Sequence, residues 1–199
     1  MFVIGLTGGI GTGKSTVARV LEEQGATVVS ADLTGHEVYL PGRPAYHELI
    51  KEFGRDILAP DETIDRKKLG GIVFSDPKNL AALNAITHPR MKGMMREKLS
   101  ELDKQGVPIA LLEAALLFEA GWDDLAEEIW VTAAPPEIAA QRVAERSNLP
   151  LDQVMDRIRS QMSTDDRVKR ADVVIDTSGD MESTERQAKG KWDELKTRL

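Results

Sequence analysis

The feature that most constrains the fold is a glycine-rich stretch at residues 8–16, which reads GGIGTGKST. It fits the pattern G-x-x-x-x-G-K-[ST] of a phosphate-binding loop, with Gly8, Gly13, Lys14 and Ser15 at the fixed positions. Glycines are needed in such a loop because successive backbone N–H groups must converge on phosphate oxygens without a side chain in the way. The pattern also requires a strand before the loop and a helix after it, and so it fixes how the fold begins.

The residues on either side of the loop meet this requirement. Residues 2–6 are apolar and predict a short buried strand, and residues 16–24 carry Val17, Val20 and Leu21 at helical spacing. The alternative is a glycine-rich turn that happens to precede a helix. A chance match to the whole pattern in a chain of this size is on the order of one per cent, so we favour a nucleotide-binding loop.

The loop residues divide the work of binding a nucleotide and its metal. Lys14 can reach the β- and γ-phosphates, and the Ser15 hydroxyl is placed to bind Mg²⁺. The helix that follows offers unpaired N–H groups and the positive end of its dipole to the same anion. We therefore predict that six consecutive residues contact the nucleotide: Gly11, Thr12, Gly13, Lys14, Ser15 and Thr16.

The length and charge of the chain narrow the class of protein. At 199 residues it is one domain with room for a small insertion. Its net charge of −7 argues against broad binding to nucleic acids or to anionic membranes, both of which need a basic surface. It has no cysteine, and its pattern of apolar residues leads us to expect neither a signal peptide nor a membrane-spanning stretch. We expect a cytoplasmic protein.

A second strand at residues 27–30 leads directly to Asp32. Two strands that flank a helix start a βαβ unit, and ligands of open α/β sheets lie outside the carboxyl ends of the strands. We therefore expect Asp32 near the phosphate loop, where a carboxylate needs a metal, a hydroxyl or a cation as its partner. The alternative is that Asp32 caps a helix that begins near Leu33.

Residues 34–102 are mostly helical by their pattern, and strand signals are absent. Helices are predicted at 45–53, at 66–74 and from 77 to about 102, the last of them interrupted at His88-Pro89. A run this long between two strands indicates an inserted helical subdomain of the kind that binds a second substrate. By itself, His88 is an ordinary residue before a proline.

The rest of the chain alternates strands and helices. A continuous apolar run predicts a strand at residues 109–113, and two further strands are predicted at 128–132 and 171–176. Helices are predicted at 135–146, 151–162 and 181–199. Glu113 ends the third strand, where P-loop enzymes often hold an acid toward Mg²⁺. The helical pair after the fourth strand carries arginines, among them Arg142 and Arg146 one turn apart, which suits a lid over nucleotide phosphates. The alternative for each arginine is a solvated helix face.

These motifs, in this order, resemble the dephospho-coenzyme A kinase family nearly from end to end. The resemblance rests on residues 5–15 and Ala31-Asp32; on Arg66, Leu69, Val73-Phe74, Leu83-Asn84 and Ile86-Thr87-His88-Pro89; and on Leu116-Leu117-Phe118-Glu119, Gln141-Arg142, Glu145-Arg146, Arg159-Ser160-Gln161-Met162 and residues 171–176. Four positions depart from the family's usual residues: Ser30, Lys67, Glu113 and Ala115.

The resemblance implies a fold and a reaction. The expected fold is α/β, a three-layer P-loop kinase with five parallel strands. It has a core at 1–33, 105–137 and 168–199, a helical substrate-binding insertion at about 34–104 and a helical lid at about 138–167. The implied reaction is phosphorylation by ATP, with Mg²⁺, of the ribose 3′-hydroxyl of dephospho-coenzyme A, which gives coenzyme A and ADP.

The resemblance also implies roles for single residues. Lys14, Asp32 and Arg142 would be catalytic, with Asp32 accepting the proton of the 3′-hydroxyl. Arg66 and His88 would join Asp32 in binding dephospho-coenzyme A, and Ser15 would bind the metal.

Two other functions remain open at this point. A related P-loop kinase acting on another nucleoside or small alcohol would share the loop, the lid and Asp32. A nucleotide-binding regulator would share the loop but would not turn over an acceptor, and it would give Asp32 and the lid no role.

Overall fold

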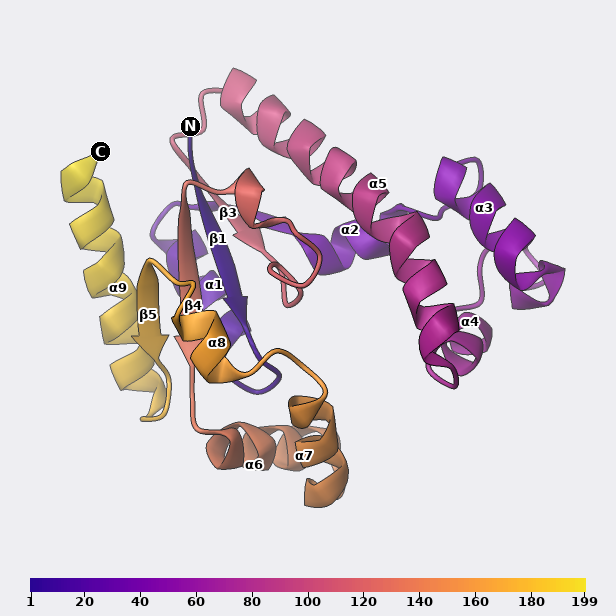
Figure 1. Ribbon diagram of the computed structural model, residues 1–199. Helices are drawn as coiled ribbons and strands as arrows, with labels where there is room; N and C mark the ends of the chain where they lie inside the picture. The colour runs from indigo at the N-terminus through magenta and orange to yellow at the C-terminus, as the bar shows by residue number, and fades with distance from the viewer. The chain divides into compact units, whose positions relative to one another are not determined.

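Five strands form one parallel sheet in the computed structural model, which describes residues 1–199 (Figure 1). The strand order is β2-β3-β1-β4-β5, and all four pairings are parallel. The predicted α/β fold with a five-stranded parallel sheet is confirmed. The strands are β1 (Phe2–Gly8), β2 (Thr27–Ser30), β3 (Ile109–Glu113), β4 (Glu128–Ala133) and β5 (Val173–Asp176).

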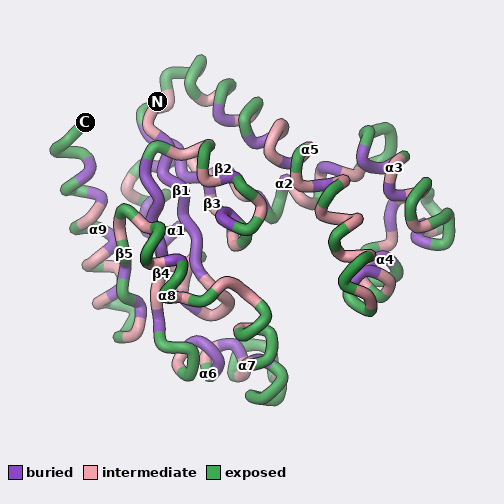
Figure 2. The backbone as a smooth tube through the Cα atoms, in the orientation of Figure 1, coloured by how far each residue is buried: buried purple, intermediate pink, exposed green.

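Burial follows the strand order. The three central strands β3, β1 and β4 are buried along almost their whole length, whereas the edge strands β2 and β5 are only partly buried (Figure 2). A strand inside a parallel sheet is covered on both faces and therefore reads as a continuous apolar run, which is why the central strands could be predicted from the sequence.

One face of the sheet is covered by α1 (Lys14–Glu23) and α9 (Met181–Arg198). Alternate residues of a strand face the same side, and Ile4 and Leu6 of β1 pack there. The core on this side also holds Val17, the fully buried Trp130 and Trp192 of α9. Burial of aromatic side chains of this size contributes strongly to stability.

Two elements pack on the other face of β1 and β4. One is the segment that follows β3, and the other is a short helix. Ala114 donates its N–H to the carbonyl of Leu6, and Leu117 and Trp122 are buried. This segment ends in the 3₁₀ helix η2 (Asp123–Leu125), which packs on β1, and α8 (Thr164–Val168) packs on β4.

Two helices, α6 (Pro136–Ser147) and α7 (Leu151–Arg159), form a hairpin after the carboxyl end of β4 (Figure 1). Their small core consists of Ala140, Val143 and Val154. The predicted break between them is confirmed, and Asn148 ends α6 in the left-handed conformation that closes many helices.

The end of this hairpin differs from the prediction. α7 stops at Arg159, three residues before the predicted end, and α8 was not predicted at all. The physical reason is a second helix start, because the Ser163 hydroxyl accepts the N–H of Asp166 and caps α8. A helix of five residues has too few turns to show a periodic pattern.

Residues Ala31–Ser100 form a second compact unit, distinct from the unit that contains the sheet. It holds α2 (Ala31–Glu37), α3 (Pro44–Phe53), the 3₁₀ helix η1 (Arg55–Ile57), α4 (Arg66–Val73) and most of α5 (Pro77–Lys104). Its core is its own and consists of seven buried side chains: Tyr46, Leu49, Ile57, Leu58, Ile64, Leu69 and Val73.

The predicted interruption of the long helix at His88-Pro89 is wrong, because α5 runs through Pro89 without a break. Proline cannot donate to the carbonyl four residues earlier, that of Ala85. Both Pro89 and Ala85 are exposed, so water can satisfy the freed carbonyl. The next carbonyl, that of Ile86, accepts an additional hydrogen bond of 2.6 Å from the Arg90 guanidinium.

No helix of the structure combines the length and the apolar character needed to cross a membrane.

Candidate active site

The phosphate-binding loop joins β1 to α1 and leaves a row of backbone donors unused. Gly11 and Gly13 have φ angles of 79° and 76°, which an L side chain rarely adopts. Gly13 stands at the N-cap of α1. No group of the chain accepts from the N–H groups of Gly11, Gly13, Lys14 and Ser15. Donors arranged in this way at a helix start form an anion-binding site.

Three buried threonines hold the loop in this shape. The Thr12 hydroxyl donates to the Gly9 carbonyl at 2.8 Å and lies 2.8 Å from the Thr132 hydroxyl at the end of β4. The Thr177 hydroxyl, just after β5, donates to the Thr12 carbonyl at 2.8 Å. The Thr12 side chain therefore points into the protein and serves as a brace. The roles of Thr132 and Thr177 were not predicted.

Gly11 also lies against the hairpin. A Cβ atom at this position would lie 2.3 Å from the Ala139 carbonyl oxygen and 2.8 Å from Cγ2 of Val143, both on α6. Real Cβ contacts are essentially never this short, so only glycine fits here.

We expect Gly11→Ala to lower the free energy of unfolding by about 2 kcal/mol, because it adds a left-handed penalty and forces α6 to move. Gly106→Ala is the matched control, since Gly106 has a similar φ of 76° but no atom within 4 Å of an added Cβ. Chemical denaturation of both variants measures the difference. Equal losses in the two variants would show that the contact with α6 is unimportant.

Lys14 is held by an acid from the neighbouring strand. β1 pairs with β3 so that Leu6 lies beside Glu113, and the Lys14 ammonium donates to Glu113 Oε1 at 2.5 Å. Only 12% of the Lys14 side chain and 16% of the Glu113 side chain are exposed. The pair places one cation and one carboxylate directly beside the loop. Ser15, by contrast, is an exposed residue.

Arg142 and Thr16 line one small hollow beside the loop. Its volume is about 330 Å³, and the Arg142 guanidinium is tied to its wall by a hydrogen bond of 2.9 Å to the Gly179 carbonyl. Gly13 and Thr177 line the same hollow. The structure thus brings Arg142, predicted from the helical pair, next to two of the predicted loop residues.

The hairpin contacts the loop at a further point that was not predicted. The Ile10 N–H donates to Gln161 Oε1 at 3.0 Å, and the Ile10 side chain packs against the small core of α6 and α7. No sequence pattern gave Gln161 a function of its own. It therefore joins the candidate site as a contact between the loop and the segment after α7.

The remaining predicted residues belong to the second unit, Ala31–Ser100, whereas the loop belongs to the first. Asp32 lies in the first turn of α2 and is exposed, and its carboxylate makes no hydrogen bond or ion pair. Because α2 begins at Ala31, the alternative that Asp32 is a helix N-cap is wrong. Arg66 begins α4 and is exposed. His88 is half-buried, and burial lowers its pKa, so its imidazole is neutral at neutral pH.

The donor set fits a metal that arrives with a nucleotide. No group of three or more histidine, aspartate or glutamate side chains is placed to hold an ion. Mg²⁺ is usually bound by one or two protein ligands together with substrate phosphates and waters. Ser15, which is exposed, and Glu113, which contacts the neighbouring Lys14, offer one hydroxyl and one carboxylate of this kind.

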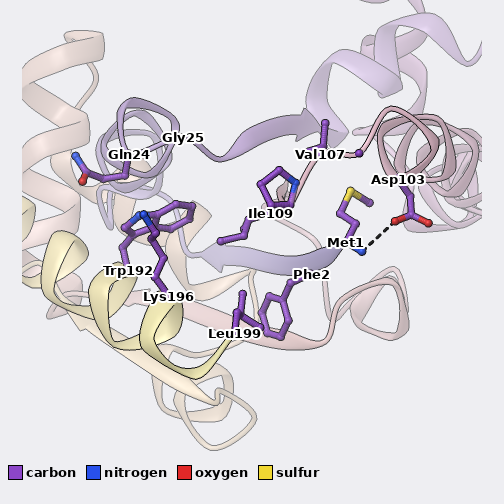
Figure 3. Close-up of a pocket in the computed structure, with 12 residues that line it drawn as sticks. Met1, Phe2, Gln24, Gly25, Asp103, Val107, Ile109, Trp192, Lys196 and Leu199 are labelled. Carbon is purple, nitrogen blue, oxygen red and sulfur yellow. Dashed lines mark hydrogen bonds and ion pairs between the residues drawn. The ribbon is translucent and has the colours of Figure 1, made fainter.

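A larger hollow of about 760 Å³ lies at the amino ends of strands β1 and β3 (Figure 3). Phe2 and Ile109, which begin β1 and β3, line it together with Trp192 of α9. The phosphate-binding loop follows the other end of β1, so this hollow is separate from the candidate active site.

Comparison with known proteins places this architecture in a family. A model of the dephospho-CoA kinase family matches residues 2–183. The chain belongs to the dephospho-CoA kinase family. A dephospho-CoA kinase of Carboxydothermus hydrogenoformans is 45% identical over 195 residues, which cover 96% of this chain and 95% of that protein.

Solved structures agree with this family assignment. A protein of Thermus thermophilus is 36% identical with a TM-score of 0.80, over 98% of this chain and 97% of that one. A dephospho-CoA kinase of Campylobacter jejuni is 26% identical with a TM-score of 0.76, over 99% of this chain and 98% of that one. As a member of the dephospho-CoA kinase family, the chain is an enzyme, and the predicted kinase activity is confirmed at the level of the family.

Proposed function

We propose that the chain transfers the γ-phosphoryl group of ATP to the 3′-hydroxyl of the ribose in dephospho-coenzyme A. The oxygen–phosphorus bond to ADP breaks, a bond from the 3′-oxygen to the same phosphorus forms, and the hydroxyl proton leaves, which gives coenzyme A and ADP. The observation that carries the proposal is the loop with free N–H groups and Lys14, within a chain matched by the family from residue 2 to residue 183.

The loop would bind the phosphates. Phosphoryl transfer depends on positioning and on neutralisation of charge more than on covalent chemistry. The N–H groups of Gly11, Gly13, Lys14 and Ser15 would donate to phosphate oxygens, and the Lys14 ammonium would reach the β- and γ-phosphates. Since Glu113 holds Lys14 at 2.5 Å, the lysine must be shared between this carboxylate and the nucleotide.

Mg²⁺ would be held by the Ser15 hydroxyl, with Glu113 nearby, and when bound it neutralises charge on the β- and γ-phosphates. The carboxylate of Glu113 would then have two cationic partners in the working site, the Lys14 ammonium and the metal. This pairing explains why an acid is tolerated beside a site that binds phosphates.

Asp32 would orient the 3′-hydroxyl and accept its proton. It stands two residues after Ser30, which is paired in the sheet with Glu113 at the carboxyl end of β3. An exposed carboxylate without a partner is available to an incoming hydroxyl. A carboxylate is only weakly basic toward an alcohol, so orientation of the oxygen contributes alongside proton removal.

Arg142 would cover the nucleotide base. The hollow of about 330 Å³ is lined by Gly13 and Thr16 at the start of α1 and by the chain after β5, so it adjoins the phosphate site directly. A guanidinium can stack on the face of an aromatic ring, and the bond to the Gly179 carbonyl orients this one. The hairpin that carries Arg142 would act as a lid that keeps water from competing as an acceptor.

We expect Arg142→Ala to lower kcat/KM for ATP by about 10- to 100-fold, the equivalent of one charge-assisted contact of about 1.5–3 kcal/mol. Arg146→Ala is the control, since Arg146 lies one turn further along α6 and is exposed. Steady-state kinetics at varied ATP measures both. Loss of stability in Arg142→Ala with normal activity per folded molecule would make Arg142 a structural residue.

Arg66 and His88 would help to bind dephospho-coenzyme A from the second unit. The exposed guanidinium of Arg66 suits a phosphate of this acceptor. Burial keeps His88 neutral, so it would contribute a hydrogen bond and no charge.

An assay of ADP release with a panel of acceptors tests the proposal. Dephospho-coenzyme A should support release of ADP far better than adenosine, shikimate or gluconate does. ADP release that is independent of the acceptor, or that another alcohol supports best, would contradict the assignment.

A further inference from the structure

The most deeply buried charged side chain of the protein has no role in the mechanism so far. Arg167 of α8 is 1% exposed, whereas the other buried charged residue, Glu128, is 8% exposed. Removing a guanidinium from water is costly unless all its donors are used. The partners of Arg167 therefore indicate what its burial achieves.

The guanidinium joins three segments that meet around the base of the phosphate-binding loop. Nη2 donates to Glu119 Oε1 at 2.5 Å, and Nη1 lies 3.2 Å from the Ala115 carbonyl and 3.3 Å from the Thr7 hydroxyl. Nε donates to the Met162 carbonyl at 3.4 Å. The planar guanidinium of one residue thus contacts the end of β1, the segment after β3 and the segment after α7.

Three of these four contacts, those to Thr7, Ala115 and Met162, lie next to a residue of the candidate active site in the chain. Thr7 directly precedes Gly8, the first residue of the loop, and Ala115 is two residues after Glu113, the partner of Lys14. Met162 directly follows Gln161, which accepts the N–H of Ile10 in the loop. A shift of the Met162 carbonyl would therefore move the contact between the hairpin and the loop.

We propose that Arg167 is a positioning residue for phosphoryl transfer, a proposal that rests on the function proposed above. Its guanidinium holds the segment that follows α7 in a fixed position beside the loop. The hairpin of α6 and α7 then covers the phosphates in one position and excludes water. The planar guanidinium is required because it presents five donors in fixed directions, which a lysine ammonium cannot reproduce. A buried ion pair is by itself weak support for a role in stability, since apolar replacements often fold equally well.

The test is Arg167→Lys, which keeps the positive charge and the ion pair with Glu119 but loses the planar set of N–H donors. We expect kcat for transfer to dephospho-coenzyme A to fall about 10- to 100-fold, as for the loss of a charge-assisted contact. KM for ATP should change less, because Lys14 and the loop N–H groups remain. ATP hydrolysis without acceptor should not fall in proportion, so the ratio of hydrolysis to transfer should rise about tenfold or more.

Arg170→Lys is the matched control, since Arg170 lies three residues further on. It is 43% exposed, pairs with Asp123 at 3.0 Å and lies over the Phe118 ring. Its kcat and its ratio of hydrolysis to transfer should equal those of the unsubstituted protein. Glu119→Gln provides a second test at the buried site, because it keeps the shape of the partner while weakening its hold on Arg167.

The outcomes separate the two proposals. If the unsubstituted protein does not phosphorylate dephospho-coenzyme A, the proposed function fails. If it does, and Arg167→Lys keeps kcat per folded molecule or lowers kcat without raising the ratio, the positioning role of Arg167 is wrong. Should Arg167→Lys fail to fold, Glu119→Gln is judged by the same ratio, and an unchanged ratio in it would equally overturn the proposal.

Discussion

Lys14→Ala should lower turnover by about 10²–10³-fold and weaken ATP binding. The substitution removes the point charge that neutralises the β- and γ-phosphates in a site where the lysine is only 12% exposed. It also leaves the Glu113 carboxylate without its partner at 2.5 Å, so a negative charge then faces the phosphates. Isothermal titration with a non-hydrolysable ATP analogue and steady-state kinetics measure the two effects separately.

A double variant distinguishes these two causes. In Lys14→Ala with Glu113→Gln the uncompensated carboxylate is gone, so we expect part of the ATP affinity to return. Turnover should stay low, because the cation that stabilises the transferred phosphoryl group is still missing. Normal turnover in Lys14→Ala alone would mean that the loop does not hold the reacting phosphates.

Asp32→Asn should lower turnover by about 10²–10⁴-fold, the usual contribution of a general base. Asparagine keeps the size of the side chain and one hydrogen-bond acceptor but cannot take the proton of the 3′-hydroxyl. ATP affinity should stay the same or rise slightly, because a negative charge is removed while Lys14 and the loop are intact. Rapid-quench measurement of a single turnover isolates the chemical step from product release.

Glu182→Gln is the control for this substitution. Glu182 also lies in the first turn of a helix, α9, and its only partner is Arg186 in an exposed pair at 3.9 Å. Loss of a favourable carboxylate from a helix start is thus matched in the two variants, and only Asp32→Asn should lose activity. Near-normal turnover of Asp32→Asn with ATP bound would leave the proposed mechanism without its base.

The elements whose cause is local were predictable from the sequence. The loop pattern requires glycines, a lysine and a hydroxyl at fixed spacing, and buried parallel strands read as unbroken apolar runs. Residues 27–30 and 109–113 are strands with the predicted bounds. The predicted break in α5 was wrong because the local rule for proline does not take the exposure of the site into account. Ala85 and Pro89 are both exposed, so water can satisfy the carbonyl that Pro89 leaves without a donor.

The supports of the site could not be predicted, because they depend on residues far apart in the chain. Thr132 and Thr177 are 120 and 165 residues from Thr12, and each is an ordinary strand or turn residue until the sheet brings it to the loop. Gln161 lies 151 residues from Ile10, and Arg167 lies 160 residues from Thr7. A single sequence carries no signal for pairs at such separation.

The most direct test of the proposed reaction is identification of the product formed from dephospho-coenzyme A, ATP and Mg²⁺. Mass spectrometry and phosphorus NMR of the purified product give its mass and the position of the new phosphate. We expect one additional phosphoryl group, on the 3′-oxygen of the ribose, formed in equal amount with ADP. Folded protein that yields no such product, or that places the phosphate on another oxygen, would contradict the assignment of the chain as a kinase of this hydroxyl.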